Sequence, residues 1–586
     1  MKKLFAILLA LVTVFSFCAC NPNSGTGVGG DVDAKSLLSD AFIDPVNGWK
    51  AYDDLIAQIK AETNYEKRAE LMHKAEDILM SNGCVIPLYY YNDIYMQKSY
   101  VENVYCNLFG YKFFHNVNMT NGSKVVRINL ASEPDFLDPA LNSSVDGACL
   151  AVNSFAGLYT YDKDGKTVPD LATGYTVSEP AEDGSVTFTV KLKENLKWSD
   201  GSVLNANDFV YSWKRAAAEK TASDYGYMFS TFVGYPNDLS VSAPDANTLV
   251  FSLTAPCAYI EGLMAFPTFF PVKQAAVEAY ANWETAPGGW CQEAGFISNG
   301  PFICTGWTHD QSMVYEKNPN YHNASAVTIE KIEFMLSADD TAIYNAYKAG
   351  NVDFIDSVPT DAIKDLKNDP EFKIIDNLGT YYVAFNANSE LFAGKTAEEA
   401  ACMRLAFNIL IDREYICETV GQTGQIAANS YIPVGMKDGK GGIFKPTAAD
   451  NAYFDDKAIN NNFEETLEKA RTYLKAAGFK FDSNGKLSSE TPIVIEYLTN
   501  DGTGHVAAAQ AMQADFKELG IEMSIQQVEW NTFLQERKQG NFDIAREGWL
   551  ADFDDPINML EMFTTDSGNN DCQYGRNQAW KDAQAQ

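Results

Sequence analysis

The chain has 586 residues, of which 46% are hydrophobic and 13% aromatic, so it can bury more than one core. Its 45 Lys and Arg residues face 78 Asp and Glu residues, and the formal net charge of −33 opposes binding to nucleic acid or to anionic lipid surfaces. We therefore expect small molecules or other proteins as partners.

The first residues predict export. Two lysines precede an apolar stretch, residues 4–17, that is too short for a stable membrane anchor, and a small residue precedes Cys20. We assign a signal peptide to residues 1–20 and a flexible polar tether to residues 21–46. The pattern resembles a bacterial lipoprotein in which Cys20 carries lipid, although the residues before it depart from the usual lipobox and leave soluble secretion open. The prediction is an extracytoplasmic protein, anchored by lipid to the bacterial cell membrane at the cell surface or in the periplasm.

Besides Cys18 and Cys20, the chain has nine cysteines, from Cys84 to Cys572, which form no C-x-x-C pair and have no His cluster beside them. Nine is odd, so at least one thiol is free, while a bridge between Cys291 and Cys304 stays open. We expect neither a metal site nor another cofactor.

Hydrophobic periodicity predicts alternating strands and helices, which is typical of an α/β protein. Short apolar or alternating runs predict strands, and apolar residues three and four apart predict helices. In chain order the expected elements are strands at 125–130 and 187–192, helices at 207–217 and 338–349, a strand at 380–386, helices at 397–411 and 465–477, a strand at 493–497, a helix at 505–519 and a strand at 521–525.

Several sequence blocks occur in an order known from one family. They are SEPDFLDP at 132–139, GLY at 157–159, KWSDG at 197–201, DFVYSWKR at 208–215, SNGPF at 298–302, NPNY at 318–321, RLAF at 404–407 and GWLADFDDP at 548–556. In this ordered set the chain resembles the extracellular solute-binding protein family 5, and within it the oligopeptide-binding lipoproteins of ABC importers. The resemblance implies a two-lobed α/β clamp of the periplasmic-binding-protein type II with an extra domain. It also implies short peptides and ABC permease subunits as partners, and we expect a monomer.

The resemblance further implies charged anchors for the two ends of a peptide. Asp552 matches the aspartate that pairs with the ligand's ammonium, and a buried carboxylate and cation offset each other's desolvation. Arg537, Arg546 and His505 match positions that meet the carboxylate of peptides of different lengths. Without the resemblance, Asp552 would be interpreted as a solvated loop carboxylate.

Further residues match positions that line the family's pockets, where aromatic walls give large contact area at little entropic cost. Their alternative role is core packing, the commoner fate of such side chains. An acid that some oligopeptide binders carry is missing at residues 143–145, where Asp146 is the nearest acid. The matching residues are Tyr91, Asn299, Tyr321, Asn500, Trp530, Gly548 and Trp549.

A segment that closes the family's fold stands near the beginning of this chain. The stretch TDSGNN at 565–570 is soon followed by the last residue, whereas the family's helical pair, its IPLYYY strand and its GYKFF ending occur within residues 47–118. We predict a circular permutation, which is possible when the N- and C-termini of the usual fold lie close together in space. A remnant of a tandem duplication and a truncated or misassembled sequence are the open rivals. In each case Tyr91 is expected to line one cleft with Trp549 and Asp552.

The domain prediction follows from this assignment, with residues 47–118 as the displaced segment. Lobe I comprises 125–155 and 245–325 with 92–118, the extra domain 156–244, and lobe II 326–586 with 47–91.

An enzyme is not supported, because the chain lacks a G-x-S-x-G elbow, an H-E-x-x-H helix and a Gly-rich phosphate loop. Within the binding class, dipeptides, nickel or other metal chelates, haem and short glycans are alternatives. Asp552 together with several cations favours a zwitterionic peptide.

Overall fold

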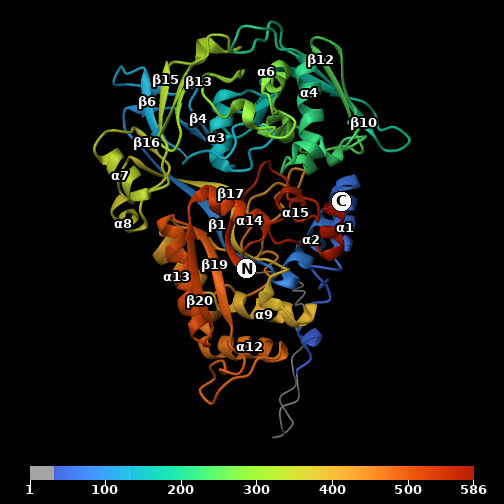
Figure 1. Ribbon diagram of the computed structural model, residues 1–586, viewed down its shortest axis with the longest axis vertical. Helices are drawn as coiled ribbons and strands as arrows, with labels where there is room; N and C mark the ends of the chain where they lie inside the picture. Colours follow the sequence, from blue (N-terminus) through green and yellow to red (C-terminus); the bar gives the residue numbers. More distant parts are fainter. Residues whose placement is uncertain (1–31, 131, 586) are drawn as a thin grey trace, which may run out of the picture.

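The computed structural model describes residues 32–130 and 132–585, and it forms two lobes joined by two long strands (Figure 1). These strands are β1 (Val85–Gln97) and β17 (Phe372–Phe385), which run antiparallel and continue from one lobe into the other. The predicted two-lobed α/β clamp is confirmed. The signal peptide and Cys20 lie outside the described residues.

Lobe I is built on one end of the main sheet. β6 (Val125–Asn129) lies between two parallel neighbours, β15 (Lys331–Met335) and β16 (Phe354–Ile355). Helix α7 (Asp340–Lys348) connects these two neighbours, as expected for parallel strands. β13 (Phe302–Thr308) and β14 (Ser312–Lys317) extend the sheet, and α3 (Val145–Ser154) packs against it.

This pairing corrects the predicted boundary between the lobes. The sequence analysis assigned all residues from 326 onward to lobe II, but β15 and β16 pair with β6 in lobe I. Apolar periodicity identifies a strand without identifying its partner, which is why the boundary was placed too early.

Lobe II carries the other end of the main sheet, in which β21 (Ile544–Leu550) pairs with β17. The second half of β17 is buried from Asn377 onward, as expected for a strand covered on both faces. The remaining elements are β19 (Val494–Asn500), β20 (Glu522–Val528), α9 (Ala397–Leu410), α12 (Phe463–Ala476), α13 (Thr503–Lys517), α14 (Trp530–Gln539) and α15 (Ile557–Glu561).

A separate four-stranded antiparallel sheet enlarges lobe I. Its helix α4 (Ala206–Ala217) begins at a capping box formed by Asn205 and Asp208. The sheet ends at Leu253, beyond the predicted limit of the extra domain at residue 244, because its last hairpin continues past that point. Its strands, in spatial order, are β11 (Val241–Asp245), β12 (Thr248–Leu253), β10 (Val186–Leu192) and β9 (Ala172–Val177).

The early segment packs into lobe II beside the end of the chain, where Figure 1 shows α1 (Lys50–Ala61) and α2 (Tyr65–Asn82) next to α15. The indole of Trp49 donates to the carbonyl of Phe563 at 2.8 Å. Both terminal nitrogens of Arg68 donate to the buried carboxylate of Asp555 at 2.8 Å. A buried bidentate pair of this kind fixes one docking geometry. That the chain is circularly permuted stays a prediction.

Gly83 ends α2 in a left-handed conformation, with φ 70°, and turns the chain into β1. β1 then lies between β16 and β17 in the main sheet. The displaced segment thus supplies one of the two strands that join the lobes.

The predicted tether is wrong for its second half. Ala34–Leu37 forms a short 3-10 helix that packs on α9, and the carbonyl of Pro45 accepts a hydrogen bond from the amide of Gly575 at 2.9 Å. Apolar side chains at Ala34, Leu37 and Leu38 join the core, which a flexible polar tether would not allow.

The ten elements predicted from periodicity are all present. Their ends are shifted by a few residues, except that β17 begins eight residues before the predicted start at 380. All nine cysteines from Cys84 to Cys572 are free thiols. No helix within residues 32–130 and 132–585 has the length and apolar character of a membrane span.

Candidate functional site

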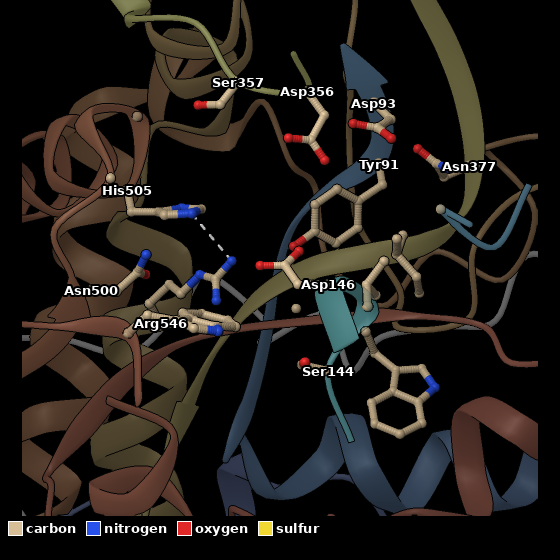
Figure 2. Close-up of a pocket in the computed structure, with 18 of the residues that line it drawn as sticks. Tyr91, Asp93, Ser144, Asp146, Asp356, Ser357, Asn377, Asn500, His505 and Arg546 are labelled. Carbon is tan, nitrogen blue, oxygen red and sulfur yellow. Dashed lines mark hydrogen bonds between the residues drawn. The ribbon is translucent and has the colours of Figure 1, made fainter. Parts of the chain in front are cut away.

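A cavity of about 480 Å³ lies where the lobes meet, and residues of both lobes and of the two joining strands line it (Figure 2). Its volume falls within the usual range for small ligands, roughly 300–1,000 Å³. Of the predicted site residues, the cavity brings together Tyr91, Asn500, His505, Trp530, Arg537, Arg546, Gly548, Trp549 and Asp552.

Tyr91 reaches the cavity at an irregularity between the joining strands. Its neighbours Tyr90 and Asn92 pair with Thr380 and Asp376, so three residues of β17 lie opposite Tyr91 alone. A Cβ atom on Gly548 would lie 2.0 Å from the Tyr91 hydroxyl. Only glycine therefore allows the ring to lie across β21.

Asp552 follows β21 and is only 5% exposed. Its carboxylate accepts hydrogen bonds from the Tyr225 hydroxyl at 3.1 Å and from the Asn558 amide at 2.8 Å. Burial raises its pKa to about 7, although these two hydrogen bonds oppose the rise. The neighbouring acids are both paired, Asp554 with Lys437 and Asp555 with Arg68. Among described residues Asp552 has no basic partner, so its charge is left for a ligand.

Arg546 is a cation in the same cavity without an ion-pairing carboxylate among the described residues. Its guanidinium lies 5.6 Å from the ring centres of Tyr381 and Trp530, and one terminal nitrogen lies 3.2 Å from His505 Nε2. Because a guanidinium only donates, Nε2 accepts and the His505 proton is on Nδ1, 3.0 Å from the Tyr381 hydroxyl. Burial and the charge of Arg546 lower the pKa of His505 well below its usual value, which keeps the ring neutral.

Arg537 also lines the cavity, but protein carboxylates already occupy it. Its guanidinium lies 2.8 Å from an oxygen of Glu547 and 2.8 Å from an oxygen of Asp571. Two buried acids thus contact the guanidinium already, and burial raises the pKa of both. Arg537 lines the cavity wall, and its role as an anchor for a peptide carboxylate stays a prediction.

The two pocket tryptophans are held by different contacts. The indole of Trp549 donates to the Asn558 side-chain oxygen at 3.0 Å, and Trp530 packs under Arg546. The side-chain oxygen of Asn500 is buried without a hydrogen-bond partner. It is an acceptor left for a ligand or water.

Asn299 and Tyr321 do not line this cavity, which corrects their prediction. Asn299 is 2% exposed and holds the backbone of Ala156, accepting from its amide and donating to its carbonyl. Tyr321 packs on His322, with ring centres 4.5 Å apart. Both serve lobe I packing, which a sequence match alone does not distinguish from lining a pocket.

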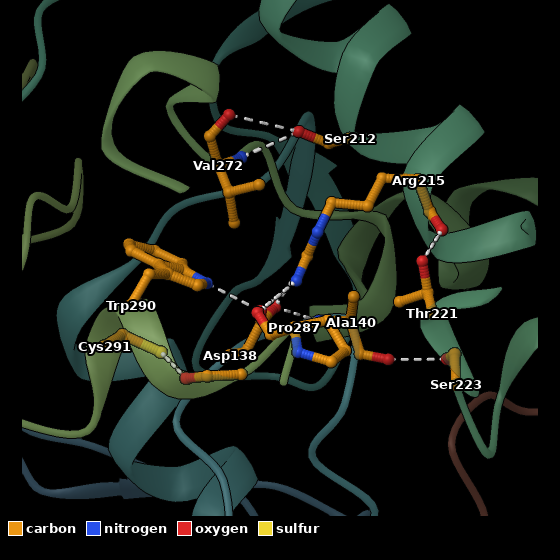
Figure 3. A network of polar contacts seen from close by, with 11 residues as sticks. Asp138, Ala140, Ser212, Arg215, Thr221, Ser223, Val272, Pro287, Trp290 and Cys291 are labelled. Carbon is orange, nitrogen blue, oxygen red and sulfur yellow. Dashed lines mark hydrogen bonds and ion pairs between the residues drawn. The ribbon is translucent and has the colours of Figure 1, made fainter. Parts of the chain in front are cut away.

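Two of the matching sequence blocks, residues 132–139 and 208–215, likewise have a packing role. Asp138, fully buried, accepts from Arg215 of α4 and from the indole of Trp290, as Figure 3 shows. Arg215 also donates to the carbonyl of Pro287 at 2.8 Å. This network fastens the four-stranded sheet to the loop after β6.

Sequence reasoning missed a charged cluster on the lobe I side of the cavity. Asp93, Lys112, Asp146 and Asp356 line it, and Figure 2 shows Asp356 and Asp93 above Tyr91 and Asp146 below it, toward Arg546. The position of Asp356, directly after β16, was an available signal, because ligand sites in α/β sheets lie at the carboxyl ends of strands. No group of His, Cys, Asp and Glu among the described residues has the arrangement of a metal site.

Comparison with known proteins agrees with this geometry. The family model "Bacterial extracellular solute-binding proteins, family 5 Middle" matches residues 166–571. The oligopeptide-binding protein OppA of Bacillus subtilis is 30% identical over 469 residues, covering 77% of this chain and 79% of its own length. The periplasmic murein peptide-binding protein MppA of Escherichia coli is 30% identical over 457 residues, covering 75% and 78%.

Solved structures match over a similar share. The murein tripeptide binding protein MppA of Escherichia coli superposes with a TM-score of 0.65 at 27% identity, covering 79% of this chain and 87% of that one. Listeria monocytogenes OppA bound to peptide gives a TM-score of 0.66 at 25% identity, with the same coverage of 79% and 87%. The chain belongs to the bacterial extracellular solute-binding proteins, family 5.

Proposed function

We propose that this protein is the extracytoplasmic receptor of an ABC importer, which captures short peptides between its lobes and delivers them to a membrane permease. One observation carries the proposal: a single cavity holds a buried carboxylate, Asp552, and a guanidinium, Arg546, and neither has an ion-pair partner among the residues that the structure describes. A zwitterionic peptide supplies the two opposite charges. The printed names of the relatives, which include oligopeptide- and murein peptide-binding proteins, support the same ligand class.

The binding mode joins general and specific contacts. Backbone hydrogen bonds to an extended peptide supply affinity for any sequence, and the charged ends fix its position. Aromatic walls at Trp530, Trp549 and Tyr91 offer contact area to varied side chains. We further propose that the protein acts as a monomer, is held at the membrane by lipid on Cys20, and does no chemistry on its ligand.

The test is native mass spectrometry of the purified protein, followed by calorimetry with trialanine. Mixed short peptides in the spectrum and saturable binding of trialanine are expected. A single metal chelate, haem or sugar, with no binding of trialanine, would refute the proposal.

Two chemical controls use the charges directly. Acetylation of the peptide's α-amine removes the partner of Asp552, and amidation of its carboxyl end removes the partner of Arg546. Each modification should weaken binding by roughly tenfold or more, because it strands one buried charge.

A further inference from the structure

Three acidic side chains from separate segments line the lobe I wall of the cavity together with one lysine, which pairs with two of them. Lys112, 3% exposed, lies 2.7 Å from Asp93 of β1 and 3.5 Å from Asp356. Asp146, in the first turn of α3, lines the same cavity and has no hydrogen bond or ion pair to its side chain from any described residue. Lys112 and Arg546 both act on Asp146 and lower its pKa against the effect of burial. The three acids still outnumber these two cations.

A second, independent feature of this wall is an unsatisfied acceptor. Asn377 is 6% exposed and lines the cavity, and its side-chain oxygen has no hydrogen-bond partner. Its amide nitrogen donates to the carbonyl of Leu108 at 3.4 Å, which leaves the oxygen on the other side, beside Asp93 in Figure 2. A buried acceptor without a donor costs free energy unless a ligand or water supplies one.

Every unsatisfied group in this wall accepts hydrogen bonds or carries negative charge, so its complement is a cation with several N–H donors. An ammonium carries three donors and a guanidinium five. A divalent metal ion is a poorer match, because Lys112 stands within the cluster and would repel it.

We propose that Asp93, Asp146, Asp356 and Asn377 form a subsite for the basic side chain of a bound peptide, so that the receptor prefers peptides containing lysine, arginine or a similar diamino acid. This inference rests on the proposed function, since it names one side chain of the same ligand. The α-ammonium has its own partner in Asp552, which follows β21 of lobe II.

The charge state of the empty cluster supports the assignment. Burial raises the pKa of Asp356 to about 8; Asp146 and Asp93 add to the rise, and Lys112 opposes it. Burial likewise raises the pKa of Asp146 to about 6. The empty cluster therefore holds a proton near neutral pH, and an entering cation takes its place.

The test compares tripeptides that differ only in one charge. Lysine is placed in turn at the first, second and third position of trialanine, and each peptide is paired with its norleucine counterpart, which has similar length without the charge. Calorimetry at pH 7.5 on the wild-type protein should show at least tenfold tighter binding of lysine at one position, while glutamate there binds more weakly than norleucine.

The variants Asp146→Asn and Asp356→Asn, alone and together, locate the preference. The double variant should reduce the lysine-to-norleucine ratio to below about threefold while the norleucine peptide binds as before. Asp183→Asn, on an exposed turn of the four-stranded sheet, is the matched control and should leave the ratio unchanged.

The outcomes separate this inference from the proposed function. If the norleucine peptides bind but no position prefers lysine, the subsite is refuted and the peptide receptor stands. Equal weakening of both peptides by the double variant would also overturn the subsite, because the cluster would then hold the backbone or the α-ammonium. If no tripeptide binds to the wild-type protein, the proposed function itself fails. The comparison of glutamate peptides with norleucine peptides uses only the wild-type protein, so it does not depend on whether a variant folds.

Discussion

The substitution Asp552→Asn tests most directly whether Asp552 binds the α-ammonium of a peptide. The substitution removes a charge and keeps the shape, and the new amide can still be satisfied. Its oxygen can accept from Asn558, and its nitrogen can donate to the Tyr225 hydroxyl, which both donates and accepts. The variant should therefore fold and lose only the charge.

The size of the effect follows from burial and protonation. Truncating one partner of a buried, hydrogen-bonded charge pair costs about 2–5 kcal/mol of binding. Asp552 has a pKa of about 7, so ionising it at pH 7 costs about 0.4 kcal/mol of that gain. At least about 1.6 kcal/mol remains, so we expect trialanine to bind the variant at least about fifteenfold more weakly than the wild type.

The pH dependence has a definite sign. The ligand binds the ionised carboxylate, so binding releases a proton below pH 7 and the affinity falls as the pH falls through about 7. Binding of trialanine at pH 5.5 should be about twentyfold weaker than at pH 7.5. Asp552→Asn should lose this part of the pH dependence.

Stability of the empty protein gives an independent readout. The folded-state pKa of Asp552 lies above the unfolded value of about 3.9, so this residue costs stability as the pH rises from about 4 to 7. At pH 8 the empty variant should unfold at the same or a higher temperature than the wild type. A variant that keeps both the wild-type affinity and its pH dependence would remove Asp552 from the site.

Three other changes probe neighbouring features. Arg68→Ala leaves the buried carboxylate of Asp555 without its partner and should lower the free energy of unfolding by about 3–5 kcal/mol in urea titrations. The same change at Lys67, whose side chain is 58% exposed, should lower it by less than about 0.5 kcal/mol. Equal losses would contradict the argument that Arg68 docks the early segment. Arg546→Gln should weaken peptides with a free carboxyl end by roughly tenfold and leave C-terminal amides unchanged in calorimetry, and a loss shared by both would count against its role. Gly548→Ala should displace Tyr91 and weaken trialanine, with partial recovery on adding Tyr91→Phe; wild-type affinity in the single variant would show that the ring can move freely.

Much of the fold could be predicted because its periodic elements are long and flanked by clear caps. The helix at 397–411, for example, begins at a capping box of Thr396 and Glu399. The strand containing IPLYYY was expected to end at Tyr91, where polar Asn92 and Asp93 follow. It continues to Gln97, because Asn92 bonds to Thr423 and Asp93 pairs with Lys112. A local sequence pattern does not reveal partners that lie far away along the chain.

The candidate site, like the fold, could be predicted only in part from the sequence. The resemblance placed nine residues around one cavity, but it could not show which charges are already neutralised. Arg537 looked like a free anchor until Glu547 and Asp571 were seen to face it. The acids of the lobe I wall come from three separated segments, so no short motif contains them. Charge balance within a cavity is a property of the folded chain.

The docking of the early segment has a consequence for the order in which the protein folds. Trp49 and Arg68 make their buried contacts with Phe563 and Asp555, so α1 and α2 leave the ribosome long before their partners exist. Until residues beyond 550 are synthesised, the faces of these two helices that contact α15 stay uncovered. The strand that follows them joins both lobes, and pairing so distant along the chain is slow. The lobe II wall of the peptide cleft, which includes Asp552, is therefore completed only when the end of the chain has been made. A chain cut before residue 550 would expose the uncovered helix faces to chaperones and proteases.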